Sequence, residues 1–130
     1  MIVVDSSALI AILRDEPERR RFIDAIVDHG TPRISAATYL EASMVMELRL
    51  GDRGGREVDG LIEDIGIEIV PFDRAQAMVA RDAFRRYGKG RHGAALNFGD
   101  CFIYALAKTL GAPLLFKGND FALTDIKRAL

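Results

Sequence analysis

The sequence is short of the residues that define several large protein classes. Its single cysteine, Cys101, cannot form an internal disulfide, which excludes a disulfide-stapled secreted fold. Eighteen lysines and arginines nearly balance nineteen aspartates and glutamates, so binding of nucleic acid through an overall positive field is excluded. No apolar run approaches the roughly 20 residues of a membrane span. The first 13 residues contain an acid and no basic residue, so we expect no secretory leader and a cytoplasmic protein.

What is present is the composition of an ordinary globular domain. The chain has 130 residues, of which 49% are hydrophobic and 28% charged. Domains commonly contain about 100–150 residues, so we expect one domain, 1–130, with a core of its own.

Short β-branched or apolar runs alternate with longer stretches of helical periodicity. Strands are predicted at 2–4, 33–35, 67–70 and 113–116; helices are predicted at 6–13, 18–29, 37–50, 56–65, 74–87 and 97–110, with a turn at 52–55. Strands separated by helices predict an α/β fold of three α/β/α layers, with a mainly parallel central sheet of four to five strands.

Acidic side chains occur where the predicted strands end. Asp5 follows the first strand, Asp120 lies just beyond the fourth, and Glu41 and Asp100 lie in the first turns of two helices. Sites in parallel α/β sheets form beyond the carboxyl ends of the strands, so we expect all four carboxylates at one edge. Each also has a structural interpretation: Asp5 can cap a helix, Asn97 and Asp100 can form a capping box, and Asp120 can start a helical turn.

The surroundings of Glu41 favour a functional role more strongly. It lies in the stretch AATYLEASM, which is otherwise uncharged, and a carboxylate there loses hydration unless something pairs with it. Carboxylates that converge repel one another and raise one another's pKa, and a divalent cation removes that penalty. Oxygen ligands without histidine or cysteine select Mg²⁺, or Mn²⁺, rather than zinc. Such an ion activates water and binds phosphate oxygens, which indicates phosphodiester hydrolysis.

A second cluster of side chains is basic. Residues 84–93 read FRRYGKGRHG and carry Arg85, Arg86, Lys89 and Arg91 without an acid. One interpretation is a solvated helix end whose cations complement the helix dipole. The other is a set of contacts to the backbone phosphates of RNA or DNA, next to the helix that carries Asp100.

The histidines and the cysteine predict no chemistry of their own. His29 ends a helix and His92 lies in the basic loop, so we do not expect both imidazoles in one metal-free nuclease site. Cys101 lies beside Phe102 and Ile103 in a predicted helix, and we interpret it as core rather than as a nucleophile.

Four segments together resemble the PIN-domain ribonucleases, in particular the VapC toxins of type II toxin–antitoxin systems. They are VVDSSALIAIL at 3–13, SAATYLEASMV at 35–45, YGKGRHGAALNFGDCFIYALAK at 87–108 and PLLFKGNDFALTDI at 113–126. They follow one another at family spacing over nearly the whole chain. The pairing of the GDC-aromatic helix with the KGxDF strand end is typical of one VapC subgroup.

The resemblance implies roles for individual residues. Asp5 and Asp100 match the principal Mg²⁺ ligands of the family, and Glu41 matches the third acid, which binds the metal directly or through water. Many relatives carry a fourth acid where this chain has Gly118, so Asp120 is the candidate for that role here. Two neighbouring side chains are implied to support these ligands from outside: Ser7, which would orient Asp5, and Asn119, next to Asp120.

The resemblance also implies a reaction and partners. The reaction is in-line attack of metal-activated water on an RNA phosphorus, which leaves a 5′-phosphate and a 3′-hydroxyl. The partner is a small VapB-like antitoxin whose C-terminal segment covers the site and whose other domain binds the operator DNA. Homodimers formed through helix faces are usual in the family.

Three other hypotheses stay open at this stage. A phosphoacceptor receiver domain has a similar length and also binds Mg²⁺; it would need an acceptor such as Asp73 and a lysine such as Lys117. A PIN-like scaffold without nuclease activity could serve only to bind a partner. DNA could be the substrate, since metal chemistry at phosphorus does not need the 2′-hydroxyl, and the resemblance alone favours RNA.

Overall fold

Four short strands form one parallel sheet in the computed structural model, which describes residues 1–130. The strands are β1 (Ile2–Val4), β2 (Pro32–Ser35), β3 (Glu68–Val70) and β4 (Leu114–Leu115), in the spatial order β3-β2-β1-β4. The helices are α1 (Ser6–Leu13), α2 (Arg19–His29), α3 (Ala36–Leu50), α4 (Asp52–Ile65), α5 (Arg74–Tyr87) and α6 (Phe98–Leu110). Every pair of neighbouring strands is parallel, as the alternation of strands and helices predicts.

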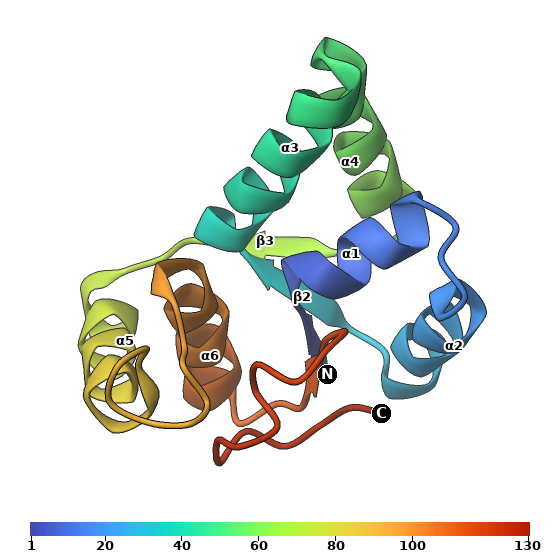
Figure 1. The fold of residues 1–130 in the computed structure, drawn as a ribbon. Helices are drawn as coiled ribbons and strands as arrows, with labels where there is room; N and C mark the ends of the chain where they lie inside the picture. The colour runs from blue at the N-terminus through green and yellow to red at the C-terminus, as the bar shows by residue number, and fades with distance from the viewer.

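The helices lie on both sides of the sheet. Figure 1 shows α5 and α6 on one side and α1 and α2 on the other, while α3 and α4 project together above the sheet. The three-layer α/β/α arrangement is therefore confirmed. β1 is the fully buried centre of the core, because its three residues are inaccessible to solvent and pair with both β2 and β4.

The predicted turn at 52–55 is wrong, because α4 already begins at Asp52. Gly54, near the start of this helix, lets α4 approach α3 closely. A Cβ atom on Gly54 would lie 2.2 Å from the carbonyl oxygen of Met46 in α3. Gly54 is buried because it lies against α3, and α3 and α4 form a tightly packed hairpin.

One face of α3 carries large apolar side chains that no other element covers. Leu40, Met44 and Leu48 follow one another at four-residue spacing and are 58%, 58% and 88% exposed. The opposite face is buried through Thr38, Ala42 and Met46. The apolar periodicity thus predicts the helix correctly, but the apolar side chains that define this periodicity lie on its exposed face. No helix in the structure is both long enough and apolar enough to cross a membrane.

Candidate active site

Asp5 stands at the point where the central strand becomes a helix. Its backbone N–H donates to the Leu115 carbonyl of β4 at 2.9 Å, which fixes the residue at the carboxyl edge of the sheet. Its side chain caps α1, because Oδ2 accepts from the Ser7 backbone N–H at 3.1 Å and from the Ser7 hydroxyl at 2.6 Å. The Ser7 hydroxyl in turn accepts from the backbone N–H of Lys117, just beyond β4, at 2.9 Å. Ser7 therefore joins Asp5 to the next strand end.

Glu41 reaches the same edge from the second turn of α3. Its Oε1 accepts a hydrogen bond from the Ser6 hydroxyl at 2.9 Å, so a side chain from α1 holds it. Its Oε2 lies against α6, where a Cβ atom on Gly99 would be 2.1 Å away. Neither Ser6 nor Gly99 is among the site residues predicted from the sequence. The tandem Ser6-Ser7 after an acid is a signal that could have identified Ser6, whereas nothing local identifies Gly99.

Asp100 lies in the first turn of α6 and forms the capping box that its spacing from Asn97 predicts. The Asp100 backbone N–H donates to Asn97 Oδ1 at 2.9 Å, and the Asn97 backbone N–H donates to Asp100 Oδ2 at 3.1 Å. The two interpretations of this residue are therefore compatible. One carboxylate starts the helix and also lies at the acidic edge of the sheet.

Asp120 lies on the exposed segment that follows β4, with Phe121 buried beside it. Its charge is one of those that act on Asp100. Asn119 is exposed and takes part only in a local turn, in which its carbonyl accepts from the Ala122 N–H at 3.1 Å.

Burial and the neighbouring acids together raise the pKa of two of these carboxylates. Burial, followed by the charges of Asp120, Asp5 and Glu41, raises the pKa of Asp100 to about 7. Burial, assisted by the charge of Glu41, raises the pKa of Asp5 to about 6, although hydrogen bonds from Ser7 lower it. The charges of Asp5, Glu41 and Asp120 thus all act on Asp100, and the charge of Glu41 also acts on Asp5.

The donor set suits a hard divalent cation. It consists only of carboxylate oxygens, with no histidine or cysteine, and a cation would favour the ionised forms of Asp5 and Asp100, which burial and the neighbouring acids disfavour. No three acidic, histidine or cysteine side chains surround one point closely enough to hold an ion as they stand. Each is instead turned toward a local donor: Ser7 for Asp5, Ser6 for Glu41 and Asn97 for Asp100. Rotation of these side chains would be needed for ion binding.

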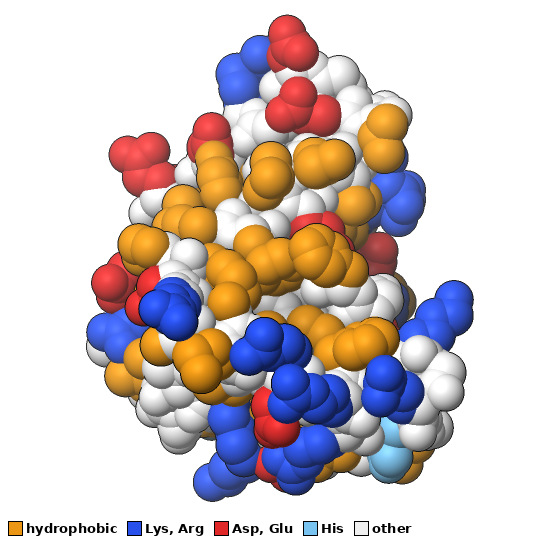
Figure 2. All heavy atoms as spheres, turned by 90° about the vertical axis from the view of Figure 1, so that its left-hand side faces the viewer, with side chains coloured by type: hydrophobic (Ala, Val, Ile, Leu, Met, Phe, Trp, Pro, Cys, Tyr) orange, Lys and Arg blue, Asp and Glu red, His pale blue; other side chains and the backbone are white.

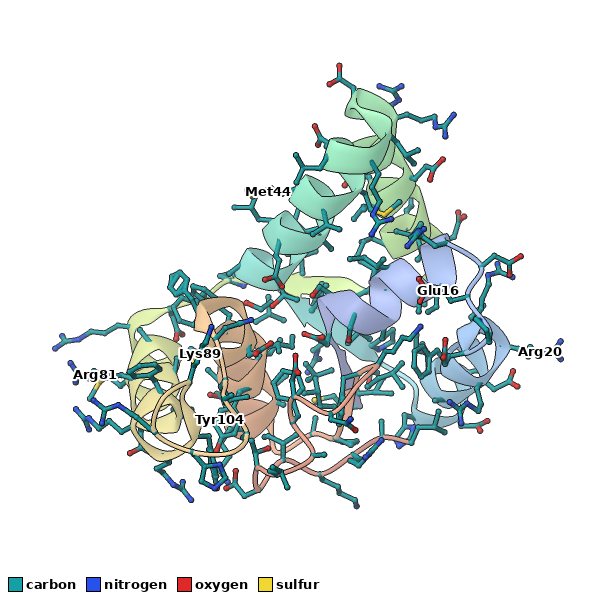
Figure 3. The ribbon with its side chains drawn as sticks, in the orientation of Figure 1. Glu16, Arg20, Met44, Arg81, Lys89 and Tyr104 are labelled. Atoms are coloured by element: carbon teal, nitrogen blue, oxygen red, sulfur yellow. The ribbon has the colours of Figure 1, made fainter.

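The basic loop is closed at its base and exposed along its length. The Lys89 N–H donates to the Leu96 carbonyl and the Leu96 N–H donates to the Tyr87 carbonyl, at 3.0 and 2.9 Å. Lys89 lies where the loop passes in front of α5 and α6 (Figure 3). All four predicted phosphate-binding side chains are exposed: Arg85, Arg86, Lys89 and Arg91.

Two of these arginines already have neighbours on the protein. Arg86 donates to the Tyr87 hydroxyl at 3.1 Å and lies 3.7 Å from an Asp82 oxygen. The guanidinium of Arg91 stacks 5.3 Å from the Phe84 ring centroid. Lys89 and Arg85 make no such contact, so they are the cations most available to a phosphate.

The remaining reactive groups lie outside this site. His92 Nδ1 accepts a hydrogen bond from the Ala94 N–H, at 3.0 Å, within the loop, and His29 lies at the end of α2. Cys101 is buried, as its interpretation as core predicts, and burial raises the pKa of its thiol.

The geometry argues against a receiver domain. β3, which precedes Asp73, is an edge strand of the sheet rather than a central one, and the Asp73 carboxylate caps α5 by accepting from the Gln76 N–H. The Lys117 ammonium points to Glu16 and Glu18, at 2.6 and 3.2 Å, rather than to the acids.

Comparison with known proteins identifies the family. Residues 2–127 match the PIN domain family. The chain is 52% identical over 125 residues to Ribonuclease VapC of Mycolicibacterium smegmatis, which covers 96% of this chain and 97% of that protein. The chain belongs to the VapC ribonucleases of the PIN-domain family. Ribonuclease VapC30 of Mycobacterium tuberculosis is 50% identical over 125 residues, which are 96% of this chain and 95% of that VapC.

Solved VapC structures have the same fold at much lower identity. The structure of VapBC2 from Rickettsia felis, bound to a DNA fragment from its promoter, matches with a TM-score of 0.78 and 14% identity, over 98% of this chain and 96% of that one. The three-layer arrangement seen here is therefore the VapC fold.

Proposed function

We propose that this chain is a metal-dependent endoribonuclease and the toxin of a cytoplasmic VapBC-type toxin–antitoxin pair, acting as a single PIN domain over residues 1–130. The observation that carries the proposal is the set of carboxylates from the end of β1, from α3 and from α6, where burial, together with the charges of the other acids, raises the pKa of Asp100 to about 7. Two relatives that are named ribonucleases support the same function. They are about half identical to this chain over almost their whole length.

The groups proposed to hold the ion are Asp5, Glu41 and Asp100, with Asp120 as a fourth acid. A bound Mg²⁺, or Mn²⁺, would supply a Lewis acid for the phosphate and lower the pKa of water at the site. The protein contributes the arrangement of the acids. Ser7 fixes the carboxylate of Asp5, and Ser6 does the same for Glu41.

The basic loop is the proposed contact for the RNA backbone. Arg85, Arg86, Lys89 and Arg91 would neutralise phosphates on either side of the cleaved bond, since they precede the helix that begins at the acids. Such contacts position a strand and carry little sequence information. Asn119, beside Asp120, is proposed to support the fourth acid.

The test compares wild type with Asp100→Asn in cells, by sequencing every new RNA end that bears a 5′-phosphate. Ends that appear only with the wild type would support a ribonuclease that hydrolyses the bond to a 5′-phosphate and a 3′-hydroxyl. The same ends with both folded, antitoxin-free proteins would contradict the proposal. Omitting divalent cations from a purified reaction tests the metal separately, because cleavage should then stop and return with Mg²⁺ or Mn²⁺.

We propose a VapB-like antitoxin as the protein partner. The structural neighbour from Rickettsia felis is a VapBC pair on promoter DNA, and its toxin has the fold described here. The antitoxin would cover the acids with its C-terminal segment and make the DNA contacts for both chains. Co-expression with a VapB-like chain, followed by co-purification and loss of cleavage, tests this partnership.

We also propose that the chain forms a homodimer through the face shown in Figure 2. That face carries an apolar band above a group of basic side chains. Leu40, Met44 and Leu48 form an exposed ridge on α3, and a hollow of about 570 Å³ lies between α5 and α6, lined in part by Phe84 and Phe98. An exposed ridge and a hollow on the same chain suit a twofold interface, where each copy fills the hollow of the other. Light scattering should show a dimer for wild type and a monomer for Met44→Glu.

A further inference from the structure

One face of α6 carries both an acid of the site and two side chains that bind the end of the chain. Asp100, Tyr104 and Lys108 follow one another at four-residue spacing and so lie on one stripe of the helix. The chain returns beside this helix after β4 (Figure 1). There, Asp125 Oδ1 accepts from the Tyr104 hydroxyl at 2.6 Å and Oδ2 accepts from Lys108 Nζ at 2.5 Å. Tyr104 is 2% exposed, so its hydroxyl is a firmly held donor (Figure 3).

These two hydrogen bonds are the only ones that tie residues 118–126 to the rest of the protein. The other hydrogen bonds of the segment are local, such as that from the Thr124 N–H to the Phe121 carbonyl at 3.1 Å. Phe121 adds an apolar attachment, because it is buried and packs edge-to-face on Phe116 with ring centroids 5.2 Å apart. The segment that carries Asp120 is thus fixed at Phe121 and Asp125.

The segment needs an attachment because it carries Asp120, whose charge acts on Asp100 at the start of α6. Like charges at these two places favour movement of the segment away from α6. An ion pair between Asp125 and Lys108 opposes that movement on the same helix. Burial raises the pKa of Asp125, but the hydrogen bonds from Lys108 and Tyr104 hold this pKa below its ordinary value. The Asp125 carboxylate therefore stays ionised at neutral pH.

We propose that Asp125 is a positioning residue, whose hydrogen bonds to Tyr104 and Lys108 hold Asp120 beside Asp100 so that the fourth acid is in place before a cation binds. The proposal rests on the proposed function, because it assigns a partner to one acid of that site. It adds a residue that touches none of the reacting atoms.

The first measurement is amide hydrogen exchange on the metal-free full-length protein. Asp125→Ala removes both hydrogen bonds and Tyr104→Phe removes one while keeping the ring in the core. Amide exchange over residues 118–124 should rise about tenfold in Asp125→Ala and less in Tyr104→Phe. Exchange in α6 should stay unchanged in both variants. Asp125→Asn keeps an acceptor for Tyr104 and should restore part of the protection. Unchanged exchange in Asp125→Ala would overturn the proposal.

The second measurement is Mn²⁺ binding by calorimetry, which does not depend on RNA cleavage. Asp125→Ala should weaken binding about tenfold. In an Asp120→Asn background the same substitution should have no further effect, since Asp125 acts through Asp120. Equal additional losses in both backgrounds, or no loss in either, would overturn the proposal.

Asp24→Ala is the matched control. It removes an aspartate that pairs with Arg20 on the surface of α2, and it should change neither measurement. A wild type that binds no Mn²⁺ and cleaves no RNA would refute the proposed function. The exchange comparison needs neither metal nor RNA, so it would still show whether Asp125 holds the segment.

Discussion

The carboxylate of Glu41 occupies the space where Gly99 lacks a side chain. A Cβ atom at Gly99 would lie 2.1 Å from Glu41 Oε2, well inside contact distance, while Glu41 Oε1 accepts from Ser6. Two helices that are far apart in the sequence, α3 and α6, therefore meet at one acid. The glycine is required here by the site rather than by the backbone, because its φ is not in the left-handed region.

Gly99→Ala is expected to fold normally and to lose activity. The methyl group displaces the end of a flexible side chain, not backbone, so the melting temperature should stay within about 2 °C of wild type. The displaced carboxylate leaves Ser6, and cleavage should fall about tenfold or more. Kinetics in a Glu41→Ala background provide the control, since a second loss from Gly99→Ala there would show that the glycine acts in some other way.

Asp100→Asn should separate activity from stability. The asparagine Oδ1 can still accept from the Asn97 N–H, so the helix start is kept, while one negative charge leaves the cluster. Cleavage should fall by at least about a thousandfold, and metal-free protein at pH 8 should melt at a higher temperature than wild type. Asp64→Asn, on the surface of α4, is the matched control and should alter neither quantity. A lower melting temperature for Asp100→Asn would contradict the repulsion inferred here.

The metal-free protein should become less stable as pH rises. The pKa values of Asp5 and Asp100 in the folded chain, about 6 and about 7, lie above their ordinary value of 3.8. The folded state therefore binds more protons than the unfolded state between about pH 4 and 7. The stabilisation is complete below about pH 4 and is lost as pH passes 7. Denaturant unfolding at pH 5 and pH 8 measures it.

Divalent cations should abolish this pH dependence. With saturating Mg²⁺ or Mn²⁺ the folded state keeps its carboxylates ionised, as the unfolded state already does above about pH 4, so stability should be nearly independent of pH over the same range. The Asp5→Asn/Asp100→Asn double variant serves as the control, because its stability should be nearly independent of both pH and metal there. The same decline with pH in that variant would assign the effect to other groups.

Alanine at Lys89 should weaken RNA binding without slowing the chemical step. Loss of one phosphate contact should raise KM several-fold, leave kcat unchanged and reduce the slope of log K against log salt by about 0.7. Arg20→Ala removes one cation from α2, away from the loop (Figure 3), and should leave KM, kcat and the salt slope at wild-type values. An unchanged salt slope in Lys89→Ala would place the RNA elsewhere.

Gly54→Ala should destabilise the protein although alanine favours helix formation. Its methyl group would meet the backbone of Met46 in α3, and overpacking of this kind costs about 1–3 kcal/mol. Gly60→Ala is an internal comparison in the same helix, because nothing lies within 4 Å of its added methyl group, and it should stabilise by about 0.5–1 kcal/mol. Equal effects of the two substitutions on the unfolding free energy would show that α3 and α4 separate easily.

The parts of the fold that follow from local sequence could be predicted. Buried apolar runs and helical periodicity locate all four strands and six helices to within a few residues, and the rule for strand ends brings Asp5, Glu41 and Asp100 together. The capping box at Asn97 is likewise a local pattern. The error at 52–55 arose because a glycine pair breaks an isolated helix but also permits close packing against Met46.

What could not be predicted are contacts between residues far apart in the chain. The hydrogen bond between Ser6 and Glu41 spans 35 positions, and that between Lys117 and Ser7 spans 110. No spacing rule relates such residues, because their separation is set by the sheet order rather than by one helix or turn. The exposure of the apolar α3 ridge also depends on contacts between distant elements. Periodicity shows that a helix face is apolar but not whether another element covers that face.

The capping box of α6 sets a limit on how this protein can lose its activity. The oxygen of Asp100 that accepts from the Asn97 N–H belongs to the carboxylate proposed to bind the ion, so helix initiation and cation binding use the same side chain. Replacement by a residue with no acceptor removes the hydrogen bond from the Asn97 N–H, at about 0.5–1.5 kcal/mol, together with the negative charge. Asparagine or serine keeps the helix start. Spontaneous inactive variants that still accumulate as folded protein should therefore carry those two residues at position 100 more often than alanine or valine.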